Sequence, residues 1–217
     1  MFNMDHTRGN SSRFYYRLEY VMDYVALFCR RDSDYKQREG WDVYDADRDA
    51  LSYRGNLPAV CHPPCRLWGR LSHMACRDES ITQQDKDAEK RLAIWSVDLV
   101  RYRGGVVEHP AGSRLFERLP KAGEVDAYGG FVIEIDQYDF GHVAHKQTKL
   151  YICGCRKEDL PALPPRDSSI HLCEKGKRRS ICGNVAGTVR CTQKQREYTP
   201  DQLIDWLEEV LTVIRSM

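Results

Sequence analysis

The chain has 217 residues, of which 41% are hydrophobic and 30% are charged, as in a water-soluble globular protein of one main domain. Its formal net charge of +1 provides no overall attraction for nucleic acid, so any basic surface must be local. No apolar run approaches the ~18 residues of a membrane span, and residues 1–17 lack the apolar segment of a signal peptide. We therefore expect a cytoplasmic protein without a membrane partner.

Short apolar or alternating runs that end in polar, glycine or proline residues predict a series of strands. Between the third and fourth of them, residues 85–102 predict a helix that ends at Gly104-Gly105. This order indicates an α/β sheet with parallel character, whose sites lie at the carboxyl ends of strands. The expected strands cover residues 24–29, 41–47, 57–65, 105–112, 129–141 and 148–155.

The last predicted element is a helix over residues 199–217, with Thr199 as its cap and Pro200 in its first turn. Residues 155–197 before it are polar and rich in Pro, Gly, Lys and Arg. We therefore expect residues 1–154 and 198–217 to form the α/β domain, and residues 155–197 to form a short loop-rich insert.

Side chains that can act as acids, bases or nucleophiles follow three of the predicted strands. Asp45 and Asp47 follow the second strand, Cys65 follows the third in a turn stiffened by two prolines, and Glu108 ends the fourth. A thiol and a carboxylate at neighbouring strand ends can work as a nucleophile and its acid–base partner. In the alternative interpretation, Cys65 is an inert thiol and Glu108 is a surface acid.

The order of these pieces resembles the C5-cytosine DNA methyltransferase family. Pro63-Pro64-Cys65 and Glu108-His109-Pro110 stand where that family has Pro-Pro-Cys and Glu-Asn-Val. Residues 139–154 are similar to its Tyr-Gly-x-Pro-Gln-x-Arg-x-Arg stretch, residues 45–50 to its acidic strand end, and residues 196–203 to its Arg-x-x-Thr-x-x-Glu segment. The resemblance covers roughly residues 25–205.

The resemblance implies a Rossmann-like, methyltransferase-type sheet in a compact relative of phage or prophage type. It implies that Cys65 adds to C6 of cytosine while Glu108 holds N3, in DNA after the base leaves the stack or in a free cytosine nucleotide. A cation such as Arg66 or His62 would favour the thiolate. By the same resemblance Lys149 joins the catalytic set, Asp45, Asp47 and Phe28 contact S-adenosylmethionine, and His109, His145 and Gln147 contact substrate.

The loop after the first strand departs from the family, because it has no glycine until Gly40 where the family has Phe-x-Gly-x-Gly. It carries Arg30, Ser33 and Lys36, residue types that bind phosphate, so we expect an anion there and weak binding of S-adenosylmethionine. The alternative is a solvated charged loop. The 43 residues between Cys155 and Glu197 would be a shortened counterpart of the target-recognition region.

Two other classes of protein stay open. A zinc-stabilised nucleic-acid-binding module could take four ligands from either of two cysteine-rich sets, although neither has paired Cys-x2-Cys spacing and we expect no metal. A relative that binds DNA or a nucleotide without chemistry could use a cluster of basic residues. The two zinc sets are Cys61, Cys65, His73 and Cys76, and Cys153, Cys155, Cys173, Cys182 and Cys191; the basic cluster is Lys175, Lys177, Arg178, Arg179, Arg190, Lys194 and Arg196.

Overall fold

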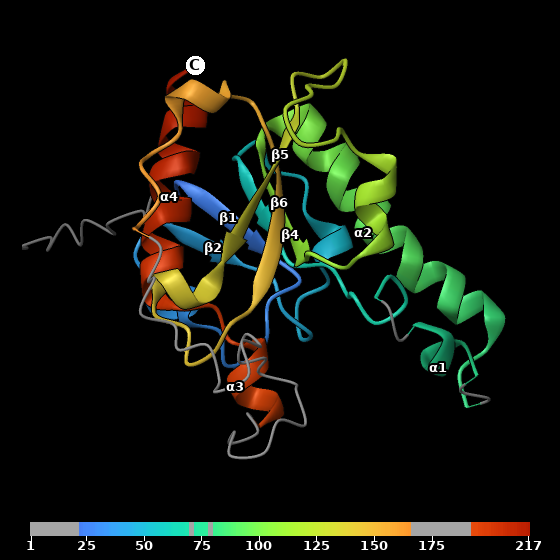
Figure 1. Ribbon diagram of the computed structural model, residues 1–217. Helices are drawn as coiled ribbons and strands as arrows, with labels where there is room; N and C mark the ends of the chain where they lie inside the picture. The colour runs from blue at the N-terminus through green and yellow to red at the C-terminus, as the bar shows by residue number, and fades with distance from the viewer. Residues whose placement is uncertain (1–21, 70–71, 78–79, 166–191) are drawn as a thin grey trace, which may run out of the picture.

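The computed structural model describes residues 22–69, 72–77, 80–165 and 192–217, and these form an α/β structure around a six-stranded mixed sheet (Figure 1). The strand order is β2-β1-β3-β4-β6-β5. Strands β1 to β4 run parallel, whereas β6 is antiparallel to both of its neighbours. The strands are β1 (Tyr24–Leu27), β2 (Trp41–Val43), β3 (Ala59–Cys61), β4 (Gly105–Pro110), β5 (Phe131–Asp136) and β6 (Gln147–Cys153).

The two long helices occur where the sequence predicts them. Helix α2 (Gln83–Arg103) begins where the Thr82 hydroxyl accepts a hydrogen bond from the Asp85 amide, and ends at Gly104. Helix α4 (Asp201–Ser216) has Pro200, not Thr199, as its cap, so that detail of the prediction is wrong. The short helices are α1 (Ser72–Cys76), α3 (Gln193–Glu197) and 3-10 turns at Asp34–Gln37, Ala50–Ser52, Arg114–Arg118, Gln137–Phe140 and Lys157–Asp159.

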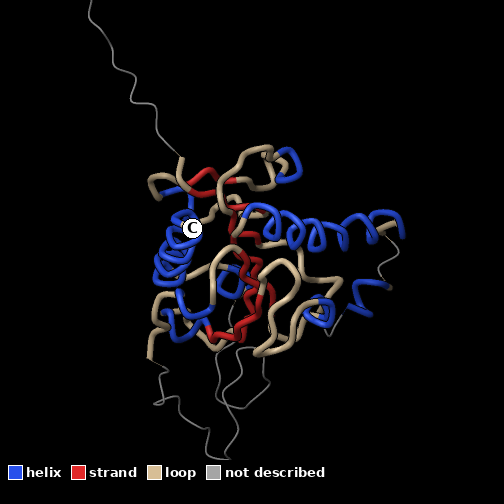
Figure 2. Tube along the Cα trace, turned by 90° about the horizontal axis from the view of Figure 1, so that it is seen from above, coloured by secondary structure: helices blue, strands red, loops and turns tan. Residues whose placement is uncertain are grey.

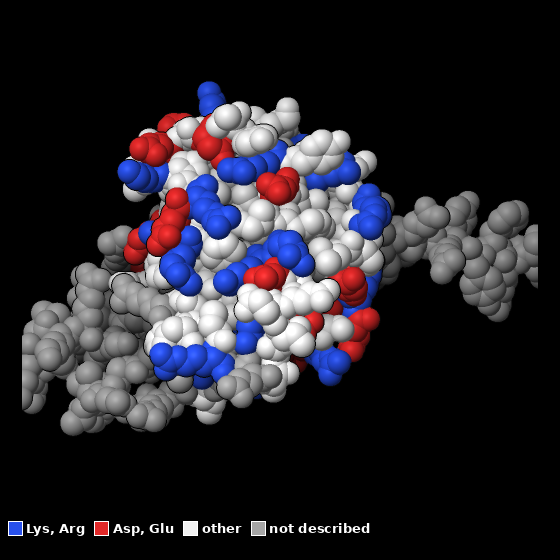
Figure 3. All heavy atoms as spheres, turned by 90° about the vertical axis from the view of Figure 1, so that its right-hand side faces the viewer, with Lys and Arg blue, Asp and Glu red and all other residues white. Residues whose placement is uncertain are grey.

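The sheet is covered on both faces, so the central strands read as continuous apolar runs. Alternate side chains point to opposite faces: Val60 packs in one core cluster with α4, and Ala59 and Cys61 pack in the other with α2. Figure 2 shows the resulting three layers, with helices on either side of the strands. On the face that α2 covers, basic and acidic side chains are interspersed (Figure 3).

Close packing of β3 against β4 depends on Gly105. Its backbone has φ +136°, and a Cβ atom built there would lie 2.1 Å from the Ala59 carbonyl oxygen. Only glycine meets both conditions without strain. Gly105 therefore allows close contact between β3 and β4, the two strands that lead to Cys65 and Glu108.

The chain order places a binding crevice beside β1. From β2 the chain returns to the other side of β1 to form β3, so the strand order reverses there, and ligands of such sheets bind at the carboxyl ends of strands next to this reversal. Within the described ranges, no helix has the length and apolar character needed to cross a bilayer. Most of the expected insert, residues 166–191, lies outside the described residues.

Candidate functional site

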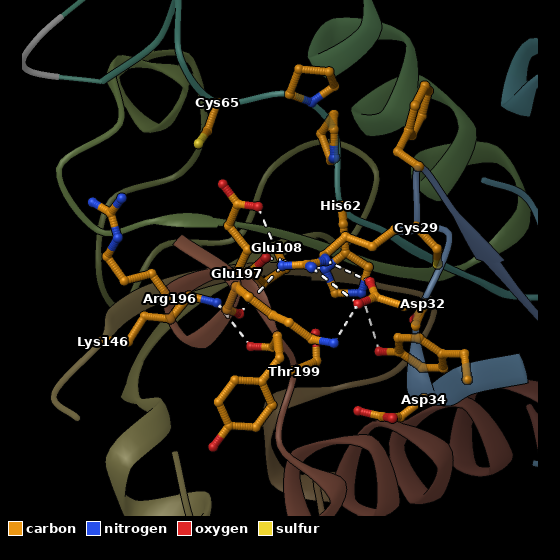
Figure 4. Close-up of a pocket in the computed structure, with 18 of the residues that line it drawn as sticks. Cys29, Asp32, Asp34, His62, Cys65, Glu108, Lys146, Arg196, Glu197 and Thr199 are labelled. Atoms are coloured by element: carbon orange, nitrogen blue, oxygen red, sulfur yellow. Dashed lines mark hydrogen bonds and ion pairs between the residues drawn. The ribbon is translucent and has the colours of Figure 1, made fainter. Parts of the chain in front are cut away.

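A pocket of about 1500 Å³ opens at the carboxyl ends of β1, β3 and β4 (Figure 4). Its walls come from six parts of the chain that are far apart in the sequence. They are residues 28–30, 32–35 and 37 after β1, residues 62–66 after β3, Glu89 of α2, residues 108–110 of β4, Lys146 just before β6, and residues 192 and 194–199 in and around α3. Cys65 and Glu108 both line this pocket, as the strand-end motifs predict.

The turn that presents Cys65 is fixed by a buried histidine. His109 is 1% exposed, and its Nε2 lies 3.1 Å from the Pro63 carbonyl oxygen, to which it must donate a proton. Its Nδ1 therefore accepts from the Ser113 hydroxyl at 2.8 Å. Burial lowers the pKa of His109, so the ring is neutral at pH 7. His109 thus supports the backbone of the turn that presents Cys65, and this bonding leaves neither ring nitrogen for a substrate.

Glu108 is a buried carboxylate with two hydrogen-bonding neighbours, Gln137 and His62. Gln137 Nε2 donates to its Oε1 at 3.1 Å, and His62 Nδ1 lies 3.1 Å from its Oε2. Burial by itself raises the pKa of Glu108, but the positive charge of Lys146 and the bond with His62 outweigh burial and lower it to about 2. Glu108 is therefore ionised at neutral pH and accepts protons and hydrogen bonds.

His62 connects Glu108 to the buried Tyr35. The Nε2 atom of His62 lies 3.1 Å from the Tyr35 hydroxyl, on the side opposite Glu108. Because a carboxylate only accepts, the ring donates from Nδ1 to Glu108. His62 directly precedes the Pro-Pro-Cys turn, so this chain of bonds holds the ends of β3 and β4 in register.

The Cys65 thiol is exposed to the pocket but is not activated in this state. Partial removal from water and the negative charge of Glu108 raise its pKa above the usual value, while Lys146 opposes them. Arg66, which we expected to favour the thiolate, instead forms an ion pair with Glu89 through Nε at 2.7 Å. His62 is likewise engaged by Glu108 and Tyr35.

The residues expected to hold S-adenosylmethionine do not fit that group as they lie. The Asp45 carboxylate is buried, pairs with Lys36, and accepts from the backbone amides of Asp47 and Arg48 at 2.8 and 3.2 Å. Asp47 points into an exposed ion pair with Arg31. Of the expected cofactor residues only Phe28 lines the pocket, with φ +60° and its ring edge-on to Trp95. The ribose contact that the resemblance implies is therefore occupied by Lys36.

The expected phosphate loop is similarly neutralised by its own neighbours. Arg30 pairs with Asp32 at 2.9 Å and with Glu197 at 3.3 Å, while Lys36 pairs with Asp45. Arg30 and Ser33 line the pocket, whereas Lys36 does not. As the loop lies, Arg30 joins two walls of the pocket instead of presenting a free guanidinium.

Just before β6 the pocket residue is Lys146, which the sequence reasoning missed. Gln147 and Lys149 do not line the pocket; the Lys149 ammonium lies 5.6 Å from the centre of the Phe116 ring. Successive strand side chains alternate in direction, and Thr148, two residues after Lys146, shares Gln137 with Glu108 through a 3.0 Å bond. Matching this stretch to the family motif one residue out of step therefore selects the side chains that point away from the pocket.

His145 also lies outside the pocket, where its Nδ1 pairs with Asp136 at 2.7 Å. The sequence places Lys194 and Arg196 in a basic cluster, but it does not indicate that residues 192–199 form a wall of this pocket, because nothing in their sequence shows where they pack. It is held by the bond from Arg30 to Glu197 and by Tyr198, whose ring stacks on His142 with centroids 4.7 Å apart.

No group of three or more His, Cys, Asp or Glu side chains able to hold a metal ion occurs in the part of the chain that the structure describes. The first zinc set, with Cys61 buried beneath α2 and Cys76 exposed on α1, is therefore not assembled. In the second set, Cys173, Cys182 and Cys191 lie outside the described residues.

Comparisons of the chain with protein-family models and with curated protein sequences found no relative. No protein-family model matches the chain. No curated protein sequence matches it either. The functional argument therefore depends on the pocket and on the motifs that form it.

Proposed function

We propose that this protein is C5-cytosine-methyltransferase-like and binds the cytosine of DNA or of a free cytosine nucleotide in the pocket, where Cys65 adds covalently to the base. The observation that carries the proposal is that Cys65 and the ionised Glu108 line one pocket at neighbouring strand ends. Both come from motifs whose order in the chain resembles that family.

The covalent step needs a nucleophile and a proton carrier, and the pocket offers both. Glu108 accepts the proton of the Cys65 thiol as the Sγ–C6 bond forms, and it donates that proton to N3 of the base. The π electrons of the C5–C6 bond form a C4–C5 double bond, and those of the N3–C4 double bond form the new N3–H bond, so atoms and charge balance. Glu108 suits this role because its carboxylate starts ionised and is oriented by His62 and Gln137.

The sheet supports a Rossmann-like type within the mixed α/β fold. The reversal of strand order at β1 places the crevice at the carboxyl ends of β1 and β3, where sheets of this type bind ligands. Strand β6 lies between β4 and β5 and is antiparallel to both. The proposal contains no methyl-transfer step, because Asp45 as it lies does not fit the ribose of S-adenosylmethionine.

The test is a covalent trap read by mass spectrometry. Full-length protein is incubated with oligonucleotides and nucleotides that contain 5-fluorocytosine or pyrimidin-2-one, with and without S-adenosylmethionine. Pyrimidin-2-one lacks the electron-donating amino group and is more electrophilic at C6. We expect one adduct per chain, on Cys65, lost in Cys65→Ser and kept in Cys76→Ser, which removes another exposed thiol.

A second candidate function, nucleotide or DNA binding without chemistry, is favoured by one specific observation. The Cys65 thiol has a raised pKa, and the neighbouring Arg66 pairs with Glu89 instead of favouring the thiolate. If the trap gives no adduct under any condition while the ligand still binds, the protein is a binder and the covalent proposal is wrong.

A further inference from the structure

Two of the cations that line the pocket differ from the rest. Arg30 pairs with Asp32 and Glu197, Lys194 with Asp32, and Arg66 with Glu89. Lys146 and Arg196 form no ion pair with a carboxylate of the described ranges; a 3.5 Å contact joins Lys146 Nζ to the Tyr198 carbonyl oxygen. These two charges are therefore available to a ligand in the pocket.

We propose that Lys146 and Arg196 bind the phosphate of a pyrimidine nucleotide whose base lies between Cys65 and Glu108. The inference rests on the proposed function for the position of the base. It adds that the pocket selects a phosphorylated ligand, through two residues that neither the strand-end motifs nor the loop after β1 indicated. The phosphate is either the terminal group of a free nucleotide or a phosphodiester next to a cytosine in a strand.

The positions of the two side chains fit this role. Lys146 reaches the pocket from the start of β6, and Arg196 extends into it from α3 toward the side where Cys65 lies (Figure 4). They therefore approach one space from two different elements. The positive charge of Lys146 is felt at both reacting groups, because it lowers the pKa of Glu108 and opposes the rise at Cys65.

The two residue types bind phosphate in complementary ways. A guanidinium forms two parallel hydrogen bonds to phosphate oxygens, whereas an ammonium acts as a compact point charge. A free base or nucleoside would leave both of them without a partner. Each cation is therefore expected to contribute about tenfold to the affinity for the phosphorylated ligand over the nucleoside.

The experiment is calorimetry in full-length Cys65→Ser, a background in which the covalent bond cannot form. The ligands are 2′-deoxycytidine, its 5′-monophosphate, and a trinucleotide with central cytosine and no terminal phosphate. We expect the monophosphate, the trinucleotide or both to bind at least about tenfold more tightly than the nucleoside. Tighter binding of the monophosphate identifies a free nucleotide as the source of the phosphate, and tighter binding of the trinucleotide identifies a strand.

Adding Lys146→Met or Arg196→Gln should remove most of that gain, while Lys121→Gln, which removes an exposed lysine outside the pocket, should keep it. Thermal melting confirms that each variant is folded. Equal binding of all three ligands, no binding of any, or equal losses in Lys121→Gln would overturn the inference. Failure of the covalent trap with the phosphate preference intact would instead reject only the covalent step.

Discussion

The Nδ1 atom of His62 lies 3.1 Å from Oε2 of Glu108, so the end of β3 is bonded directly to the end of β4 inside the pocket. Because His62 precedes the Pro-Pro-Cys turn, this bond fixes the acid relative to the nucleophile turn. It also provides one of the donors that keep a buried carboxylate satisfied.

Replacing His62 by alanine should therefore reduce both stability and adduct formation. Glu108 would lose a donor in a buried site, which costs about 1–3 kcal/mol of unfolding free energy. Urea denaturation measures this change, and the fluorocytosine trap measures the rate. His73→Ala, on the exposed side of α1, is the control and should change stability by less than about 0.5 kcal/mol. Equal behaviour of the two variants would contradict the structural role of His62.

Stability should depend on pH through Glu108. Its pKa falls from 4.5 to about 2 on folding, so its contribution is complete above about pH 4.5 and is lost as the pH falls through about 2. The decrease in unfolding free energy from about pH 6 to about pH 2.5, measured with urea, should be smaller for Glu108→Gln than for the unaltered protein. The difference should be of the order of 3 kcal/mol. Parallel decreases would show that the carboxyl is not stabilised in its ionised form.

Alkylation of Cys65 should be slow at neutral pH and should accelerate when Glu108 is neutralised. Enclosure and the Glu108 charge raise the pKa of the thiol, and only the thiolate reacts. In Glu108→Gln one of these two causes is removed, so iodoacetamide should modify Cys65 faster at the same pH. Peptide mass spectrometry gives the rate, and Cys76 in the same sample is an internal reference. An unchanged ratio of the two rates would mean that Glu108 does not influence the thiol.

Binding of S-adenosylmethionine should be weak, and Lys36→Ala should strengthen it. Lys36 holds one oxygen of Asp45, the group that the family resemblance assigns to the ribose. Calorimetry on the free protein compares Lys36→Ala with Lys121→Ala, which removes an exposed lysine elsewhere. Tight binding by the unaltered protein, or no gain in Lys36→Ala, would show that Asp45 is not the ribose acid.

Gly105→Ala should destabilise the protein far more than Gly123→Ala. Both glycines have positive φ, and a left-handed conformation costs alanine about 1–2 kcal/mol. At Gly123 a Cβ atom meets nothing within 4 Å, whereas at Gly105 it would meet the Ala59 backbone. Thermal unfolding should therefore show a modest loss for Gly123→Ala and a severe loss for Gly105→Ala. Similar losses would indicate that β3 and β4 do not need their close approach.

The elements of the fold were predictable because their sequences carry the signals of burial. The apolar runs around Val60 and Val106 are buried on both faces of the sheet, and α4 has a clear apolar stripe. The reversed direction of β6 was not predictable, because its residues are as apolar as those of a parallel strand and only the tertiary connection sets direction.

The candidate site was predictable only in part, for a similar reason. Cys65 and Glu108 end strands whose neighbours in the sheet are fixed by chain order, so both reach the same pocket. Lys146 depends on the alternation of β6, and Asp45 on a lysine nine residues earlier that folds back on it. Such contacts between side chains are decided by the turn geometry of the loops, which their composition does not specify.

The position of helix α4 in the chain determines when the pocket becomes complete during synthesis. It packs on the face of the sheet that includes Val60, Val106 and Ile152, and the segment 192–199 immediately before it closes one wall of the pocket. Both are translated after all six strands. A chain still on the ribosome can pair its strands, yet it exposes the apolar face that α4 later covers and has only part of the pocket. The complete pocket therefore forms only after α4 has emerged from the ribosome and docked on the sheet.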